Sequence, residues 1–213
     1  MEDQKKKKPI PRKRVTLYLR ELSVVVLGIV ITLGATGLIG KLQEKKNTDQ
    51  YLHAIRLELE ENLGELQKSS EFYERNFRLS QLLSTYGIDD APQDSLALYN
   101  DVYGQFFTLA FNTNAFDMMK ASGAMRLIKD KELLQSIWGC YSLLNQVQIN
   151  SNNYMEKKLT ETFRAVQESG TPRIDDMSNP HHRKLVSFYS IGWGITPLID
   201  TCSKKIEETL MMY

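Results

Sequence analysis

The sequence predicts an all-α protein in which one N-terminal transmembrane helix continues into a bundle of about four to five helices. Three observations lead to this prediction. A run of nineteen residues without a charge follows a strongly basic start. Beyond it, apolar residues recur every three or four positions, which is the spacing of one helix face. No stretch of any length alternates with the period of two that strands show.

Three segments follow from this pattern. Residues 1–21 are expected to form a basic cytoplasmic arm, residues 22–40 the transmembrane helix, and residues 41–213 a helical domain outside the cytoplasm. At 173 residues, the last segment is long enough to bury a core of its own.

The basic arm is much more positively charged than the near-neutral chain as a whole. Its first twenty residues hold eight Lys or Arg against Glu2 and Asp3, a net of 8 − 2 = +6, whereas the full chain carries only +1. A basic block directly before an apolar run favours an anionic membrane surface over nucleic acid. The membrane is therefore an expected partner, and nucleic acid is not.

The apolar run from Leu22 to Gly40 has the length of a membrane span. At about 1.5 Å per residue it reaches roughly 28 Å, close to the thickness of a bilayer core. Eight basic residues precede it, and only Lys41, Lys45 and Lys46 follow closely. This asymmetry places the N-terminus in the cytoplasm and the domain on the other side, in the periplasm for an inner-membrane protein.

A cleaved signal peptide is the alternative to a retained signal anchor. Small residues at Ala35-Thr36-Gly37 have the character of a cleavage site after a short apolar core. However, apolar residues resume at Leu38 and Ile39, and the run reaches a spanning length. A retained single-pass anchor is therefore the favoured interpretation.

A stripe of small residues within the run is a candidate helix–helix interface. Its members, Gly28, Thr32, Thr36 and Gly40, recur every four residues and so share one side of a helix. Small residues at this spacing let two membrane helices approach closely, which predicts a homodimer. The alternative is that Gly and Thr are simply common in membrane spans.

The first helix of the domain is expected to continue the span without a break to about residue 86. Its apolar face consists of Leu52, Ile55, Leu59, Leu63 and Leu66. The acidic residues Glu58, Glu61 and Glu65 are interpreted as a solvated face of the same helix.

Further helices are expected at 96–111, 115–121, 130–168 and 180–211. Gly123 should end the second of these and Asp130 or Lys129 should begin the third. In the last, Gly192, Gly194 and Pro197 predict a kink around Trp193.

The aromatic residues of segment 96–111 gather on one side of the predicted helix. A core stripe is the first interpretation, and a shelf on which a ligand stacks is the second. They are Tyr99, Tyr103, Phe106 and Phe107.

No motif in the chain indicates a catalytic, cofactor or metal site. Histidine occurs only at positions 53, 181 and 182. The segment with Asp175, Asp176, His181 and His182 is rich in turn residues, where Asp and His are common for structural reasons. We therefore predict no enzyme activity, no cofactor and no metal.

The two cysteines, Cys140 and Cys202, fall on two different predicted helices. Antiparallel packing of those helices would bring them together, and a disulfide persists in an oxidising compartment. The pair is thus a candidate disulfide, and two buried free thiols are the alternative.

Three stretches resemble a family of uncharacterised bacterial single-pass membrane proteins, defined as a domain of unknown function. They are Glu21–Ile31, Leu57–Leu63 and Asn114–Leu134, the last with its Ser-Gly pair followed by Leu-Ile and Leu. The resemblance covers roughly residues 10–165 and departs at Gly40-Lys41-Leu42-Gln43. It implies an early span and a helical domain, and it implies no activity.

The predicted function is that of a structural or interaction protein that docks partners at a membrane. Its partner would be a second copy or an unidentified membrane or periplasmic protein. The alternative is an extracytoplasmic ligand-sensing helical module that acts through a partner protein.

Overall fold

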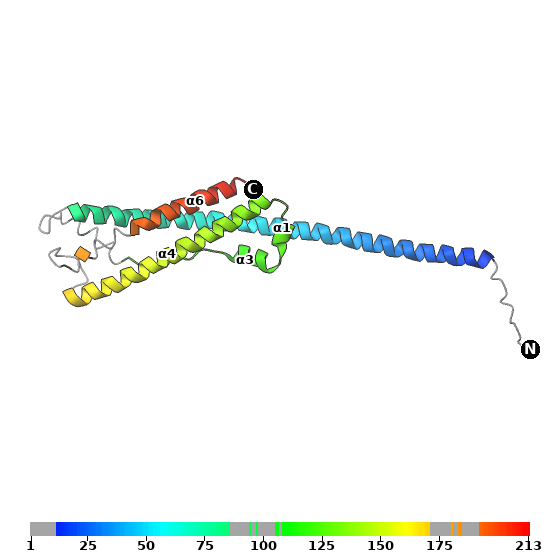
Figure 1. The fold of residues 1–213 in the computed structure, drawn as a ribbon, viewed down its shortest axis with the longest axis horizontal. Coiled ribbons are helices and arrows are strands. Elements are labelled where there is room, and N and C mark those ends of the chain that lie inside the picture. The colour runs from blue at the N-terminus through cyan, green and yellow to red at the C-terminus, as the bar shows by residue number, and fades with distance from the viewer. Residues whose placement is uncertain are drawn as a thin grey trace, which may run out of the picture. The chain divides into compact units, whose positions relative to one another are not determined.

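The structure, a computed structural model, describes residues 12–85, 94, 97, 105, 106, 108–170, 180, 183, 184 and 192–213. Within these residues the regular secondary structure is helical throughout (Figure 1). The all-α prediction is therefore confirmed. The elements are α1 (Arg12–Thr85), α3 (Asn114–Ala121), the 3-10 helix η1 (Ala124–Leu127), α4 (Lys131–Ser169), the 3-10 helix η2 (Gly192–Ile195) and α6 (Thr196–Leu210). The chain forms two compact units, Met1–Asp49 and Gln50–Tyr213.

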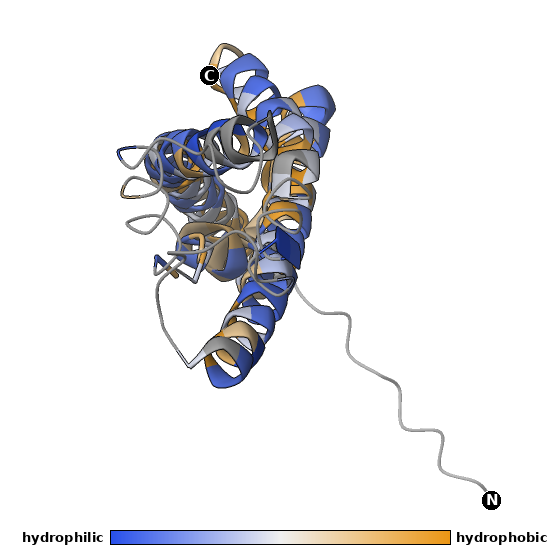
Figure 2. Ribbon diagram, turned by 90° about the vertical axis from the view of Figure 1, so that its left-hand side faces the viewer, coloured by the Kyte–Doolittle hydropathy of each residue, from blue (hydrophilic) through white to orange (hydrophobic). Residues whose placement is uncertain are grey.

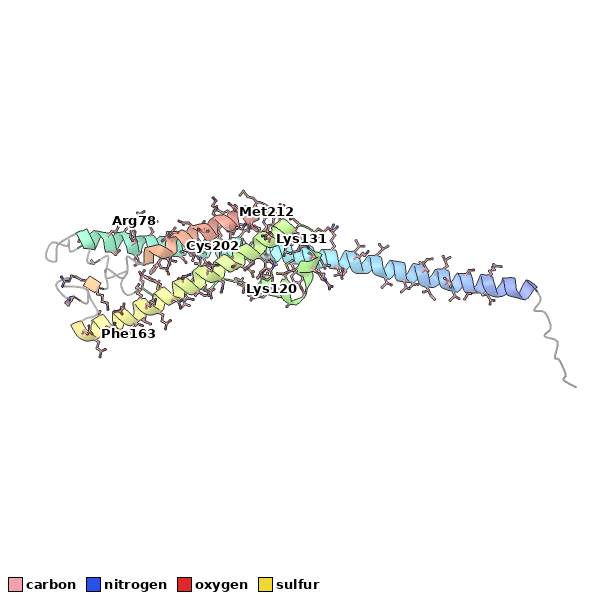
Figure 3. All side chains as sticks on the ribbon, in the orientation of Figure 1. Arg78, Lys120, Lys131, Phe163, Cys202 and Met212 are labelled. Atoms are coloured by element: carbon pink, nitrogen blue, oxygen red, sulfur yellow. The ribbon has the colours of Figure 1, made fainter. Side chains whose placement is uncertain are left out.

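Helix α1 runs for 74 residues without a break, so the predicted continuation of the apolar run into the helical domain is confirmed. The first unit contains the apolar run, and α1 there is long and apolar enough to cross a membrane. Its large side chains project from the helix and are exposed, from Leu22 at 60% to Leu33 at 68% and Ile39 at 67% (Figure 3). The core helix of a soluble protein would instead bury such side chains.

The second unit has a core built from evenly spaced buried positions on three helices, each of which carries hydrophobic and hydrophilic residues along its length (Figure 2). Steps of four and three alternate along each buried face, the spacing that lets helices interlock side by side. Each buried Leu or Ile contributes about 1.5–3 kcal/mol relative to exposure. The buried positions are Ile55, Leu59, Asn62, Leu66, Ser69, Tyr73 and Asn76 on α1, Leu133, Ile137, Cys140, Leu144, Val147, Ser151, Tyr154 and Lys158 on α4, and Ile199, Cys202, Ile206 and Thr209 on α6.

Side-chain contacts fix the direction of each helix in this unit. Tyr141 meets Glu58 near the start of α4, and Ser151 meets Tyr73 further along, at 2.6 Å between the hydroxyl oxygens. Helices α1 and α4 are therefore parallel. Helix α6 runs antiparallel to α4, because the hydroxyl of Thr209, at its end, lies 2.7 Å from that of Ser136.

An extended segment, which we call the strap (residues 105, 106 and 108–113), lies where the sequence predicts the second half of a helix. The prediction of a helix at 96–111 is wrong for its second half, because the described residues from 105 to 111 are not helical. The segment follows α4 backwards, since Gln105 lies at Lys158, Leu109 at Asn152 and Phe111 at Gln148. An extended chain covers about 3.3 Å per residue, so a short segment can span a long stretch of helix.

Helix termini follow the predicted signals closely. The Asp130 carboxylate accepts from the backbone amides of Glu132 at 3.0 Å and Leu133 at 2.9 Å, which confirms the predicted start of α4. Gly123 follows α3 with φ of 70°, a left-handed conformation that favours glycine, which confirms the predicted terminator.

The last predicted helix differs from the structure around Trp193. Instead of a kink inside one helix, the 3-10 helix η2 ends at Ile195 and α6 begins at Thr196. Pro197 lies in the first turn of α6, where its missing N–H costs no hydrogen bond. The predicted start of this helix at Asn179, together with His181 and His182, lies outside the described residues.

Candidate functional site

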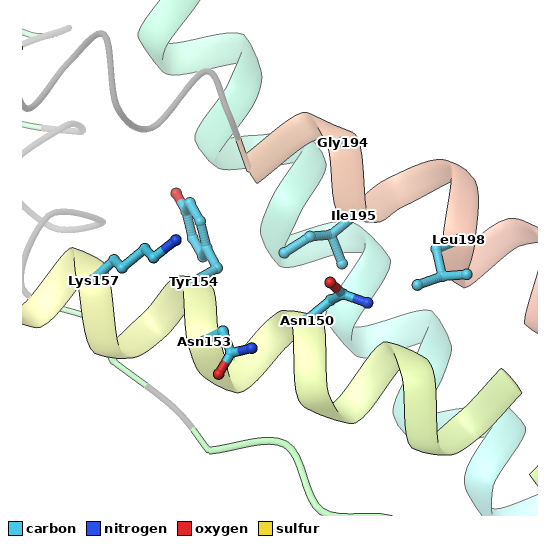
Figure 4. Close-up of a pocket in the computed structure, with 7 residues that line it drawn as sticks. All are labelled: Asn150, Asn153, Tyr154, Lys157, Gly194, Ile195 and Leu198. Carbon is cyan, nitrogen blue, oxygen red and sulfur yellow. The ribbon is translucent and has the colours of Figure 1, made fainter. Parts of the chain in front are cut away.

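A pocket of about 470 Å³ lies between α4 and the segment formed by η2 and α6 (Figure 4). Asn150 and Tyr154 approach it from α4, and Ile195 and Leu198 face them from the other side. The remaining lining residues are Asn153, Lys157 and Gly194. One wall is thus amide-rich and cationic, and the other is aliphatic.

Tyr154 forms the inner wall of this pocket and depends on Gly192. A Cβ atom at position 192 would lie 2.8 Å from Cζ and from the hydroxyl oxygen of Tyr154, so only glycine leaves room for the ring. Burial raises the pKa of the Tyr154 phenol, which keeps it neutral. Neutral amides, a neutral phenol and one cation suit reversible binding of a small polar molecule better than acid–base chemistry.

Glu58 is a buried carboxylate, and its interpretation as part of a solvated face is wrong. Its exposure is 4%, and it accepts from the amides of Ala115 at 2.7 Å and Phe116 at 3.4 Å and from the Tyr141 hydroxyl. The N-cap residue of α3, Thr113, makes no side-chain capping bond. Glu58 of α1 therefore caps the N-terminus of α3 from another helix. Its burial could have been predicted from the helical spacing, because Glu58 lies three residues after Ile55 on the buried face of α1.

The other two acidic residues of that predicted face differ from Glu58. Glu61 is exposed and accepts from the side-chain amide of Asn112 at 3.0 Å. Glu65 pairs with Lys68 at 2.6 Å in an exposed i,i+3 pair.

Lys158 is a buried lysine that the sequence analysis did not identify. It has 0% exposure, donates to the carbonyl of Gln105 and lies 5.3 Å from the ring centroid of Phe72 and 4.7 Å from that of Phe106. Burial lowers the pKa of Lys158 to about 7. The sequence does contain a signal for this burial. Lys158 follows Ile137 by three steps of seven residues, which places it on the buried face of α4.

Cys140 and Cys202 both lie in the core, on the antiparallel pair α4 and α6, and both thiols are free (Figure 3 labels Cys202). The sulfur of Cys140 lies 3.1 Å from the Thr209 hydroxyl. Burial raises the pKa of both thiols, that of Cys202 to about 12. The structure thus contains two buried thiols, the alternative to the candidate disulfide, and the pairing of Cys140 with Cys202 stays a prediction.

The predicted membrane-helix interface lies on α1 within the first unit. The Thr32 hydroxyl donates to the carbonyl of Gly28 at 2.8 Å, and that of Thr36 donates to the carbonyl of Thr32 at 2.7 Å. A Cβ atom at Gly28 or Gly40 would meet nothing within 4 Å. The stripe is therefore open along its length, with its hydroxyls already satisfied.

The predicted aromatic cluster is described only in part. Tyr99, Tyr103, Phe107 and the side chain of Trp193 lie outside the described residues, whereas Phe106 is 38% exposed beside Lys158. Asp175, Asp176 and both neighbouring histidines also lie outside them. Among the residues described, no three His, Cys, Asp or Glu side chains gather where a metal would bind.

Comparison of the chain with protein families, with curated proteins and with solved structures gives no match.

Proposed function

We propose that this protein is a single-pass membrane protein whose helical domain docks partner proteins and has no catalytic activity. The observation that carries the proposal is the uncharged run of α1, whose large side chains are exposed. Exposed apolar surface of this extent is unstable in water and stable in lipid. The basic arm before it favours an N-terminus in the cytoplasm of a bacterial cell and a domain in the periplasm. Membership of the uncharacterised bacterial family it resembles is part of the same proposal.

The chemistry of the second unit supports docking rather than catalysis. Its buried polar groups hold other parts of the chain in place: Glu58 caps α3, Asn62 binds the main chain at Asn112, and Lys158 binds the carbonyl of Gln105. Side chains that bind main chain in this way are suited to recognising polypeptide.

Two measurements test the anchor and the docking role. The mature protein should keep its N-terminus, resist extraction from membranes by alkaline carbonate, and expose only its domain to protease in spheroplasts. A mature N-terminus at Leu38 would contradict the anchor. Gentle purification of the full chain from its own membranes should recover one partner at fixed stoichiometry, and recovery of the chain alone would contradict docking.

Self-association through the small-residue stripe is one form of docking. Replacing Gly28 and Thr32 with Ile should weaken self-association in a membrane two-hybrid assay, because branched side chains hold two helices apart. Gly34→Ile is the matched control, since Gly34 lies off the stripe and is equally open. Equal signals from both variants would contradict the dimer interface.

A ligand-sensing module that acts through a partner protein is the second candidate, and the pocket of Figure 4 favours it. Ile195→Phe would fill the pocket from its aliphatic side. A ligand found by thermal shift should lose its effect on this variant and keep it on Leu210→Phe, a half-buried position at the other end of α6. A ligand that shifts both variants equally binds elsewhere.

A further inference from the structure

Side chains of α1 and α4 bind the main chain of the strap at Gln105, Leu109, Phe111 and Asn112, and we call the site that they form the groove. The side-chain amide of Asn152 accepts from the Leu109 N–H at 2.9 Å and donates to its carbonyl at 3.0 Å. Asn62, from α1, does the same at Asn112, at 2.9 Å and 2.7 Å. Gln148 accepts from the N–H of Phe111 at 3.2 Å. Two helices thus offer the strap the donors and acceptors that a neighbouring strand would offer.

Lys158 and Glu58 hold the main chain at the start of the strap and just after its end. Lys158 donates to the carbonyl of Gln105 where the strap begins, and Glu58 accepts from the amides of Ala115 and Phe116 just after it ends. A lysine side chain donates to carbonyl oxygens and a carboxylate accepts from N–H groups, so the two residues bind different groups of the main chain.

Two apolar side chains of the strap, Leu109 and Phe111, add to this recognition. Gln105, Phe106, Thr108 and Ala110 are exposed, whereas Leu109 is buried at 4%. Leu109 is the anchor, and the half-buried Phe111 packs against the core beside it. A site that binds main chain and two apolar side chains accepts many sequences.

We propose that this groove is a peptide-binding groove in which the strap is the resident ligand, and that an extended peptide segment of a partner protein with apolar residues at the Leu109 and Phe111 positions displaces it. The inference rests on the docking role proposed above and gives the partner its chemistry. While the strap is in place, the apparent affinity for a partner peptide is reduced by the fraction of molecules in which the groove is open.

The test is a titration of the full chain, in nanodiscs, with fluorescent nonapeptides. The first peptide has the sequence of residues 105–113, the second keeps only Leu109 and Phe111 and has Ala or Ser elsewhere, and the third has Asp at the anchor. Leu109→Asp in the protein weakens the strap from within. This variant should bind the first two peptides at least tenfold more tightly than the unmodified chain does, and should not bind the third.

Two groove variants identify the site of binding. Adding Asn62→Ala and Asn152→Ala to the Leu109→Asp protein should weaken peptide binding at least tenfold. Adding Asn153→Ala is the matched control and should leave binding unchanged, because Asn153 is exposed and lines the pocket of Figure 4. Binding of the first peptide alone would assign the groove to the strap of a second copy and would overturn the proposal. No binding by a Leu109→Asp protein of unchanged helicity would overturn it too.

Hydrogen exchange of the unmodified chain is a test that needs no variant. The amides of Leu109, Phe111 and Asn112 should exchange at least tenfold faster than that of Ile137 in the core, because the strap must open without global unfolding. Equal rates would overturn the proposal even where Leu109→Asp fails to fold.

The docking role and the peptide-binding groove can also fail separately. If a partner co-purifies equally with the Asn62→Ala, Asn152→Ala chain, the docking role stands and the groove is not the site of docking.

Discussion

Glu58 of α1 and Tyr141 of α4 lie 83 positions apart in the chain and share a buried hydrogen bond. The same carboxylate holds the first amides of α3, so three elements meet at one side chain. Burial is the main cause that raises the pKa of the Tyr141 phenol, and the adjacent carboxylate adds to it. Tyr141 therefore remains a neutral donor to Glu58.

Replacing Glu58 should destabilise the second unit strongly. Glu58→Ala leaves three buried donors without an acceptor and should lower the free energy of unfolding by about 3 kcal/mol, whereas Tyr141→Phe removes one donor and should cost about 1–2 kcal/mol. Urea denaturation followed by circular dichroism measures both. Glu60→Gln is the control, because its ion pair with Arg56 is exposed and should contribute less than about 1 kcal/mol. Equal losses for Glu58→Ala and Glu60→Gln would refute the capping role.

The buried Lys158 should make stability rise with pH. The pKa of Lys158 is about 7 in the folded protein against an ordinary value of 10.5, so above pH 7 the unfolded chain binds the extra proton. The free energy of unfolding should therefore increase by up to about 1.4 kcal/mol per pH unit above pH 7. Above about pH 8.5 the thiols oppose this trend, because their pKa values are raised in the folded state and stability falls as pH passes the unfolded value.

Lys158→Met should flatten this dependence between pH 7 and 8.5. Lys157→Met, its exposed neighbour, should keep the slope of the unmodified protein. Urea denaturation at four pH values in this window measures the slope for each. An unchanged slope in Lys158→Met would show that another group causes the dependence.

Two neighbouring glycines should respond differently to the same substitution. Gly192→Ala places a methyl group 2.8 Å from the ring of Tyr154 and should cost about 1–3 kcal/mol through overpacking. Gly194→Ala meets nothing within 4 Å and should be neutral or slightly stabilising. Thermal denaturation compares the two, and similar melting temperatures would argue against the close approach of Tyr154.

Thiol labelling should report the state of the core. Cys140 and Cys202 are buried and have raised pKa values, so a maleimide should label neither in the folded protein and both in urea. Intact mass without reductant distinguishes the alternatives, because a disulfide would lower it by about 2 Da and block labelling in urea as well.

Regular spacing made most of the fold predictable. Steps of three and four place Ile55, Leu59 and Leu66 in the core, and the capping signal places the start of α4 at Asp130 or its neighbour Lys129. These features depend on residues close together in the chain. A single sequence is sufficient for them, because the period of a helix and the geometry of its cap are local.

The strap was not predictable in the same way. Aromatic residues at helical spacing between 99 and 107 imitate a helix face, while the amides that hold the extended chain lie 43 to 50 positions away, at Asn152 and Asn62. The polar stretch of α4 that contains Gln148 and Asn152 looks like a weak helix until its partner is known. Pairings over such separations leave no periodic trace in one sequence.

The parallel arrangement of α1 and α4 has a consequence for biosynthesis. Helix α1 leaves the ribosome first, yet the hydroxyl that completes the environment of Glu58 follows 83 residues later. At about 5–20 residues per second, this interval lasts roughly 4–17 s. During it the nascent α1 carries an unshielded face on which Asn62, Ser69 and Asn76 alternate with apolar residues, so we expect a chaperone to bind the growing chain until α4 has been made.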